Sequence, residues 1–207
     1  MLLINSREEW RNQPRHYSSI IGAIGKALGS EGFRHSERAD LMRYGRRSGA
    51  AGELVALRLL IGSGARPDTM WITEMRSWLW LVHCMALLSG ANCDPHSNAN
   101  EASPGRVLQR AGFTELRLGR LLDARGETFN ILLERTVRQI ARFGHPLNWS
   151  KIAPLLLSRD PESIWAENAR LALSRDFLLS VAQSAQEEDA AVTGSAGDIE
   201  ATMSNHD

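Results

Sequence analysis

The chain has 207 residues, 43% of them hydrophobic, which is enough to bury a core as one domain or as two smaller ones. No apolar run approaches the ~20 residues that a bilayer-spanning helix needs, and no N-terminal stretch has the layout of a secretory signal. We therefore expect a cytoplasmic protein that makes no membrane contact.

The formal net charge of zero hides an asymmetry along the chain. Six of the 24 acidic residues lie in residues 187–207, which contain no lysine or arginine, so residues 1–186 carry 24 basic and 18 acidic residues, a net charge of +6. All the basic residues except Lys26 and Lys151 are arginines. The guanidinium fork suits phosphate and base recognition, although a general compositional bias would give the same enrichment.

The first part of the chain carries three helix signals. Ser6 and Glu9 fit a capping box. A stripe of Ile20, Ile21, Ile24 and Leu28 predicts a helix over about residues 15–28. Ser36 is the expected N-cap of the third helix.

That third helix runs into the densest positive charge of the sequence, formed by Arg43, Arg46 and Arg47. These arginines are candidates for phosphate contacts. The alternative is a solvated helix end, where the helix dipole favours cations.

Two more helices are expected before residue 90. Residues 53–61 predict a core helix. Residues 68–89 are hydrophobic nearly all round, which is typical of a helix at the centre of a bundle or in a subunit interface. Trp71, Trp78 and Trp80 are expected in the core, although exposed tryptophans at this density could stack on bases.

Residues 90–103 are low in apolar side chains and rich in Asn, Ser, Gly and Pro, so we expect a linker there. The prediction is an all-α protein of two small helical bundles, over residues 1–89 and 104–186, joined by a loop around residues 90–103. Residues 187–207 are acidic and are predicted to be a disordered tail.

The second bundle begins with Ser103 and Pro104, a typical helix start. Thr114 is the expected cap of the next helix, and Asn148 or Ser150 that of the one containing Pro154. Asp160 and Pro161 are expected to start the final helix.

The clearest periodicity lies in residues 127–142. Phe129, Leu132, Leu133, Val137 and Ile140 share one face, while Arg135, Arg138 and Arg142 form a row on the opposite face. The helix is therefore expected to bury one side and present cations on the other.

No motif for catalysis or cofactor binding is found in the sequence. Phosphate-loop, GxGxxG, HExxH and paired CxxC patterns are missing. His83, Cys84, Cys93 and His96 fit no common zinc spacing and are expected to be core histidines and reduced thiols. We expect no cofactor and no enzyme activity. The hypothesis of a metal-dependent nuclease has only this His/Cys cluster in its support.

Several runs of the chain together resemble a known family. They are GRVLQRAGFTELRLGRLLDA, VRQIARFGHPLNWSKIAPLLL and ARLALSRDFLL in the C-terminal half, and ERADLMRYGRR in the N-terminal half. These runs are similar to the small-subunit family of the type I-E CRISPR Cascade complex, also called CasB.

The resemblance implies a non-catalytic subunit that lies beside other Cascade subunits and a second copy of itself. Its basic surface would support the crRNA–target DNA R-loop and hold the displaced non-target strand. By motif position, the best candidate contacts are Arg117 and Arg138, with Arg43 less securely placed. The full set of predicted contacts is Arg117, Arg138, Arg142, Arg135, Arg43, Arg46, Arg47, Arg106, Arg110, Arg120 and Lys151.

A protein–protein adaptor is the alternative hypothesis. In it, the arginines pair with acidic neighbours and the Trp-rich segment 68–89 forms the partner interface.

Overall fold

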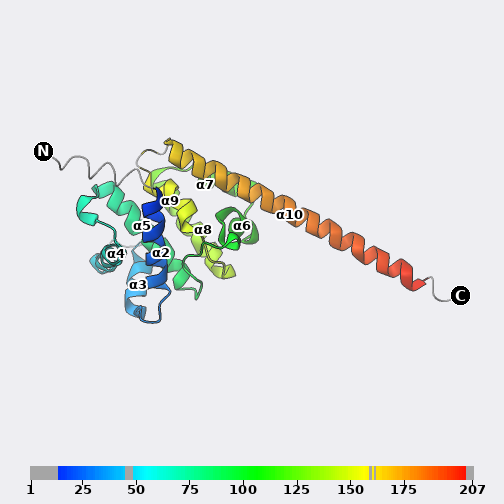
Figure 1. The fold of residues 1–207 in the computed structure, drawn as a ribbon, viewed down its shortest axis with the longest axis horizontal. Coiled ribbons are helices and arrows are strands. Elements are labelled where there is room, and N and C mark those ends of the chain that lie inside the picture. The colour runs from blue at the N-terminus through cyan, green and yellow to red at the C-terminus, as the bar shows by residue number, and fades with distance from the viewer. Residues whose placement is uncertain (1–13, 45–48, 159, 161, 204–207) are drawn as a thin grey trace.

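The computed structural model describes residues 14–44, 49–158, 160 and 162–203, with side chains described from residue 17 to residue 187 within these ranges. The described residues form nine α-helices and no strand, which confirms the all-α prediction (Figure 1). The predicted capping box at Ser6, and both Arg46 and Arg47, lie outside the described residues. The helices are α2 Pro14–Leu28, α3 His35–Arg43, α4 Ala50–Gly62, α5 Ile72–Ser89, α6 Pro104–Arg110, α7 Glu115–Asp123, α8 Gly126–Phe143, α9 Trp149–Leu157 and α10 Ile164–Met203.

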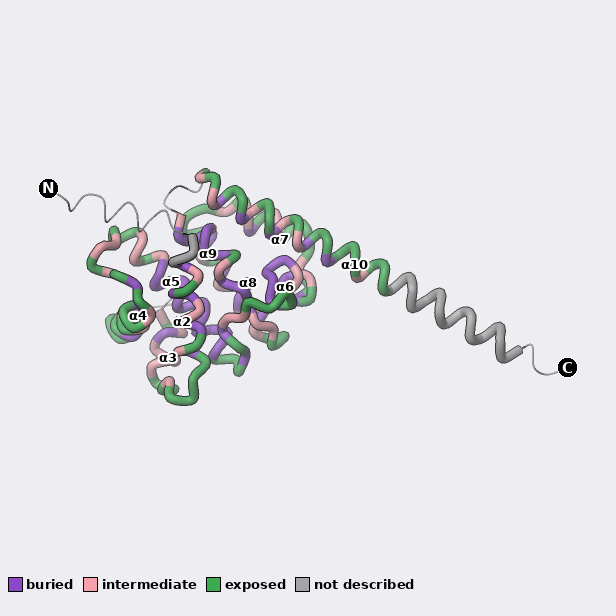
Figure 2. Tube along the Cα trace, viewed as in Figure 1, coloured by how far each residue is buried: buried purple, intermediate pink, exposed green. Residues whose placement is uncertain are grey.

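Helix α5 lies at the centre of the molecule. From Trp78 to Ser89 nearly every residue is buried, and α2, α3, α4, α8 and α9 pack around it (Figure 2). The core prediction is correct for Trp78, which is fully buried and stacks on Tyr17 with ring centroids 5.7 Å apart. It is wrong for Trp71, which is 51% exposed because it is the N-cap residue of α5 and precedes the buried part of the helix.

This burial contradicts the adaptor hypothesis where it places the partner interface on the Trp-rich segment 68–89. Residues 78–89 are buried by helices of the chain itself, so they are not free to form a partner interface. The exposed residues of the segment all come before residue 78; they are Asp68, Trp71, Ile72, Thr73 and Arg76.

Residues 90–103 are packed against the second half of the chain. The indole N–H of Trp149 donates to the Pro95 carbonyl at 2.8 Å, and the backbone N–H of Asn148 donates to the Ala102 carbonyl at 2.8 Å. The buried hydrophobic residues of both halves belong to one core cluster. The division into two bundles stays a prediction, and the two halves share a continuous core.

Helix α6 lies directly against α10. A Cβ at Gly105 would clash with the Phe177 backbone nitrogen, so only glycine allows this approach. Asp176 of α10 accepts hydrogen bonds from the Gly105 N–H at 3.0 Å and from the Ser103 hydroxyl at 2.6 Å. Ser103 does not cap α6 with its own side chain, because its hydroxyl donates to Asp176 and accepts from Lys151; Asp176 supplies the cap instead by accepting from the Gly105 N–H.

Of the other expected helix boundaries, some agree with the structure and some differ. Thr114 is the cap predicted, and Asn148 is the one of the two predicted residues that caps α9; their side chains accept from the backbone N–H groups of Arg117 and Ser150. Helix α3 has Arg34 rather than Ser36 at its N-cap. Helix α10 begins at Ile164, a few residues after the predicted start.

Helix α10 is longer than the sequence indicated. Its backbone is helical to Met203, whereas no regular structure was expected beyond residue 186. The disorder of the acidic tail stays a prediction.

Candidate nucleic-acid interface

Arg117 lies in the first turn of α7, which begins just after a sharp bend in the chain. Gly112 ends the preceding turn with a φ of +72°, a conformation that glycine adopts at little cost. Thr114 then caps α7 by accepting from the Arg117 N–H at 3.3 Å. The Arg117 guanidinium lies over the Phe113 ring, 5.7 Å from its centroid, and the residue is exposed. The ring orients the cation at the surface.

Helix α8 is amphipathic, as its periodicity predicts. Phe129, Leu133, Val137 and Ile140 are buried against the core. On the opposite side Arg135 and Arg142 are exposed, and no described carboxylate pairs with either. These two arginines fit the requirements of a phosphate contact.

Arg138 differs from the other two members of the row. Its guanidinium donates two hydrogen bonds, of 2.9 and 2.7 Å, to Oε1 of Glu134, and its side chain is 32% exposed. Oε2 of Glu134 lies 3.8 Å from Nε2 of His83, whose Nδ1 is 2.7 Å from the Leu41 carbonyl. Arg138 is therefore part of a link from α8 through α5 to α3.

The polar link lies beside the buried thiol of Cys84. Burial raises the pKa of Cys84 well above its usual range, the Glu134 carboxylate adds to this rise, and Arg138 opposes it. Both Cys84 and Cys93 are free and buried. Among the described residues, no three His, Cys, Asp or Glu side chains gather in a group that could hold a metal ion.

A hydrogen bond joins α8 to the turn between α6 and α7. Nε2 of Gln139 donates to the Ala111 carbonyl at 2.5 Å. Ala111 follows Arg110, the exposed last residue of α6, and comes two residues before Phe113. Arg142 and Phe143 lie one turn beyond Gln139 on the same side of α8.

This hydrogen bond joins the turn between Arg110 and Arg117 to the part of α8 one turn before Arg142. Arg135 lies two turns from Arg142 along α8. We call these four residues the arginine surface. They are exposed, and in the described part of the chain none of them has a carboxylate partner.

The remaining candidates lie elsewhere or in other surroundings. Arg43 is exposed on α3 and pairs with Asp40 at 2.9 Å. Nζ of Lys151 donates to the Ser103 hydroxyl at 2.6 Å, at the opposite end of α6 from Arg110. Arg106 is half-buried one turn before Arg110, and Arg120 is exposed one turn after Arg117.

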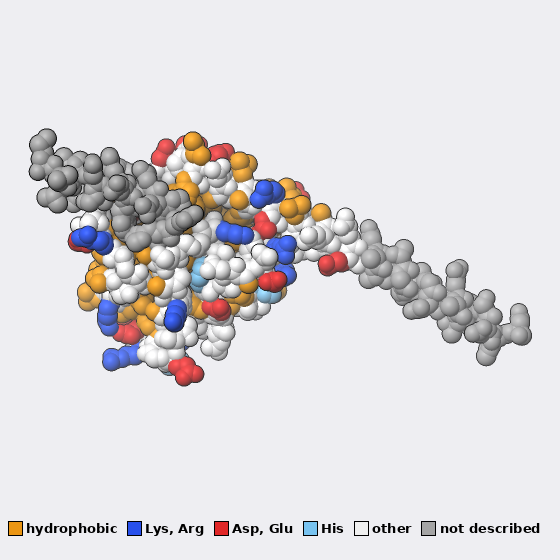
Figure 3. Space-filling view, viewed as in Figure 1, with side chains coloured by type: hydrophobic (Ala, Val, Ile, Leu, Met, Phe, Trp, Pro, Cys, Tyr) orange, Lys and Arg blue, Asp and Glu red, His pale blue; other side chains and the backbone are white. Residues whose placement is uncertain are grey.

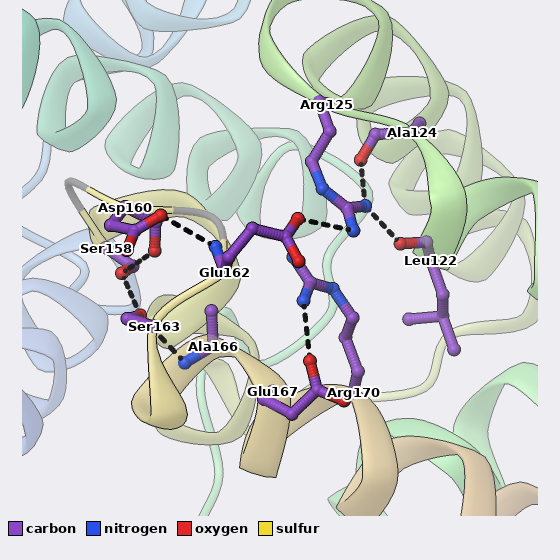
Figure 4. Close-up of polar contacts among 10 residues, drawn as sticks. All are labelled: Leu122, Ala124, Arg125, Ser158, Asp160, Glu162, Ser163, Ala166, Glu167 and Arg170. Carbon is purple, nitrogen blue, oxygen red and sulfur yellow. Dashed lines mark hydrogen bonds and ion pairs between the residues drawn. The ribbon is translucent and has the colours of Figure 1, made fainter.

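Arg125 shows how an arginine near this surface is used for structure. Its Nη1 donates to the carbonyls of Leu122 and Ala124, at 2.6 and 2.9 Å, where α7 ends. Its Nη2 reaches Glu162 at 3.4 Å, so it also holds the segment that leads into α10 (Figure 4). In the same junction Arg170 pairs with Glu167 at 3.4 Å. Neither belongs to the arginine surface.

The charge distribution is mixed on the face drawn in Figure 3. Basic side chains there stand apart from one another, with acidic and hydrophobic side chains between them. On this face the basic side chains do not form one continuous patch. No described helix is both long enough and apolar enough to cross a membrane.

The fold and this surface define an all-α protein that presents, on α6, α7 and α8, arginines with no carboxylate partner among the described residues. Residues 37–178 match the family model of the CRISPR-associated protein Cse2, and the chain belongs to this family. The match confirms the resemblance to the small subunit of type I-E Cascade. Searches of the curated proteins and of the solved structures found no match.

Proposed function

We propose that this Cascade subunit is non-catalytic and stabilises the R-loop, by binding the displaced single-stranded DNA and supporting the target strand. The observation that supports this role best is the arginine surface. A carboxylate partner would compete with phosphate for each guanidinium, and Arg110, Arg117, Arg135 and Arg142 have none among the described residues.

Binding of this kind follows the phosphate backbone. Arginine–phosphate contacts carry no sequence information by themselves, and they give an affinity that falls steeply with salt. A subunit of a surveillance complex that must accept any displaced strand needs this tolerance.

Within the Arg row of α8, we place Arg135 and Arg142 ahead of Arg138 as DNA contacts. Arg138 stays a predicted contact, but Glu134 already occupies two of its donors. Reversing its charge would set two carboxylates side by side where Glu134 is only 15% exposed, so that variant would measure stability as well as binding.

Further predicted contacts remain at Arg43, Arg46, Arg47, Arg106, Arg120 and Lys151. The partners we propose are other Cascade subunits, a second copy of this chain, and the R-loop with its non-target strand.

An adaptor without DNA contact is the second candidate, and one observation favours it. Ile164, Leu171 and Leu178 follow one another at intervals of seven residues on α10 and are 80%, 61% and 49% exposed. This spacing suits a helical partner.

Salt-dependent binding separates the two candidates. We would titrate a labelled oligothymidine with the full chain by fluorescence anisotropy at several salt concentrations. The double variant Arg135→Gln/Arg142→Gln should reduce the log–log salt slope by roughly 1.4, because each lost contact with single-stranded DNA contributes about 0.7.

The matched control is Arg66→Gln, which removes an exposed arginine already paired with Asp68 at 3.1 Å and should keep the wild-type slope. Wild-type protein that shows no salt-dependent binding would favour the adaptor. An unchanged slope in the double variant would reject Arg135 and Arg142 as the contacts.

A further inference from the structure

Phe143 is the last residue of α8 and is 53% exposed. Gly144 follows with a φ of +69° and ends the helix, so the ring lies at the C-terminal end of α8. Among the aromatic side chains that the structure describes, only Trp71 and Phe143 are exposed.

The surroundings of Phe143 are cationic. Arg142 precedes it, and Gln139, one turn earlier on the same side, binds the Ala111 carbonyl. That bond fixes the turn that carries Phe113, whose ring holds the exposed guanidinium of Arg117. The Arg117–Phe113 contact and the consecutive residues Arg142 and Phe143 thus lie on elements that a hydrogen bond joins.

This combination matches the chemistry of single-strand recognition. A strand without its complement exposes the faces of its bases, which stack on aromatic rings without regard to sequence, while cations follow its phosphates. The Phe113 ring already carries a guanidinium, whereas the Phe143 ring is exposed and has no described aromatic or cationic side chain stacked on it.

A protein partner fits the end of α8 at Arg142 and Phe143 less well. The buried centres of protein interfaces are depleted of charge, and cations left without a partner there are costly. Arg142 next to the ring, and Arg135 two turns away, have no described carboxylate to neutralise them. A polyanion satisfies these charges and the ring together.

We propose that Phe143 is a stacking platform for an unpaired nucleobase of the single strand whose phosphates Arg142 and Arg117 bind. The proposal rests on the proposed function and adds a contact to the base, which the arginines alone do not provide.

The test compares two ligands for the full chain by fluorescence anisotropy: a labelled oligothymidine, and an abasic strand of the same length with the same phosphates. Wild type should bind the oligothymidine roughly 5- to 150-fold more tightly, the range expected for one stacked base. Phe143→Ala should lose most of this preference and keep its affinity for the abasic strand, while Phe143→Trp should retain the preference.

Leu171→Ala is the control, since it truncates another exposed large side chain, 61% exposed on α10, and should keep the wild-type preference. Equal thermal midpoints for Phe143→Ala and wild type would establish that the variant is folded, as expected for an exposed ring.

The outcomes separate this inference from the function on which it rests. Wild type that binds both strands equally, or a preference that survives in Phe143→Ala, would overturn the stacking role and leave phosphate binding intact. Wild type that binds neither strand would overturn the proposed function itself. A Phe143→Ala protein that keeps the preference but no longer joins the other Cascade subunits would assign the ring to a protein interface.

Discussion

At the scale of single residues, His96 shows how the connection between the halves of the chain is sensitive to protons. Its Nδ1 accepts a hydrogen bond from the backbone N–H of Trp149 at 3.3 Å, at the start of α9. Burial lowers the pKa of His96, and the nearby Asp94 opposes this effect only in part. The folded protein therefore favours the neutral imidazole, which alone can accept this bond.

The lowered pKa predicts a loss of stability in acid. The unfolded chain takes up the proton first, near the ordinary histidine pKa of 6.5, so the free energy of unfolding should fall as the pH drops from there toward the folded-state pKa. Urea unfolding at about pH 7.5 and about pH 5.5 measures the loss. His96→Asn, which cannot be protonated, should lose less stability than wild type over this range. Equal losses in the two proteins would contradict the role given to His96.

At the scale of helices, the contact of α6 with α10 depends on one missing side chain. A Cβ at Gly105 would lie 2.7 Å from the Asp176 carbonyl carbon and would also clash with the backbone nitrogen of Phe177. Since backbone atoms cannot rotate away, Gly105→Ala should lower the free energy of unfolding by about 1–3 kcal/mol, as overpacking does elsewhere.

Gly119 provides the matched control for this substitution. It lies in α7, and an added Cβ there meets no atom within 4 Å. Gly119→Ala should raise stability by about 0.5–1 kcal/mol, because alanine loses less backbone entropy in a helix. Chemical denaturation of both variants gives the comparison. Effects of the same sign would show that α6 and α10 do not approach each other as closely as described.

Local signals in the sequence predicted much of this helical layer. The buried stripe of α8 and the caps at Thr114 and Asn148 depend on residues within a few positions of one another, so they could be identified from spacing. The cap that Asp176 provides for α6 could not, because the two partners are 71 residues apart. Long-range pairs of this kind leave no periodic trace.

The candidate site was predictable to a similar degree. The spacing of Arg135, Arg138 and Arg142 correctly indicated one face of α8. It could not distinguish Arg138 from the others, because the burial of Glu134 beside His83 depends on how α5 packs against α8. The exposed ring of Phe143 was also missed, since an aromatic residue at a helix end is more often buried.

At the scale of the whole molecule, the core continues from one half of the chain to the other. Helix α5 of the first half packs against α8 and α9 of the second. Tyr17 stacks on Trp78 and, with centroids 5.3 Å apart, on Trp165 of α10. An interface this apolar couples the unfolding of its two sides, even where each side is a bundle in its own right.

We therefore expect a single cooperative unfolding transition, with coincident urea curves from circular dichroism and tryptophan fluorescence. Leu41→Ala in α3 and Ile140→Ala in α8 each truncate a side chain that is at most 1% exposed, and each should cost about 2–5 kcal/mol. Each should shift both curves together, although the two residues lie on opposite sides of residues 90–103. Leu54→Ala, at a position 63% exposed, should leave the midpoint nearly unchanged. If Ile140→Ala instead separated the curves into two steps, residues 1–89 and 104–186 would be independent folding units, because a shared core cannot lose one side while the other stays folded.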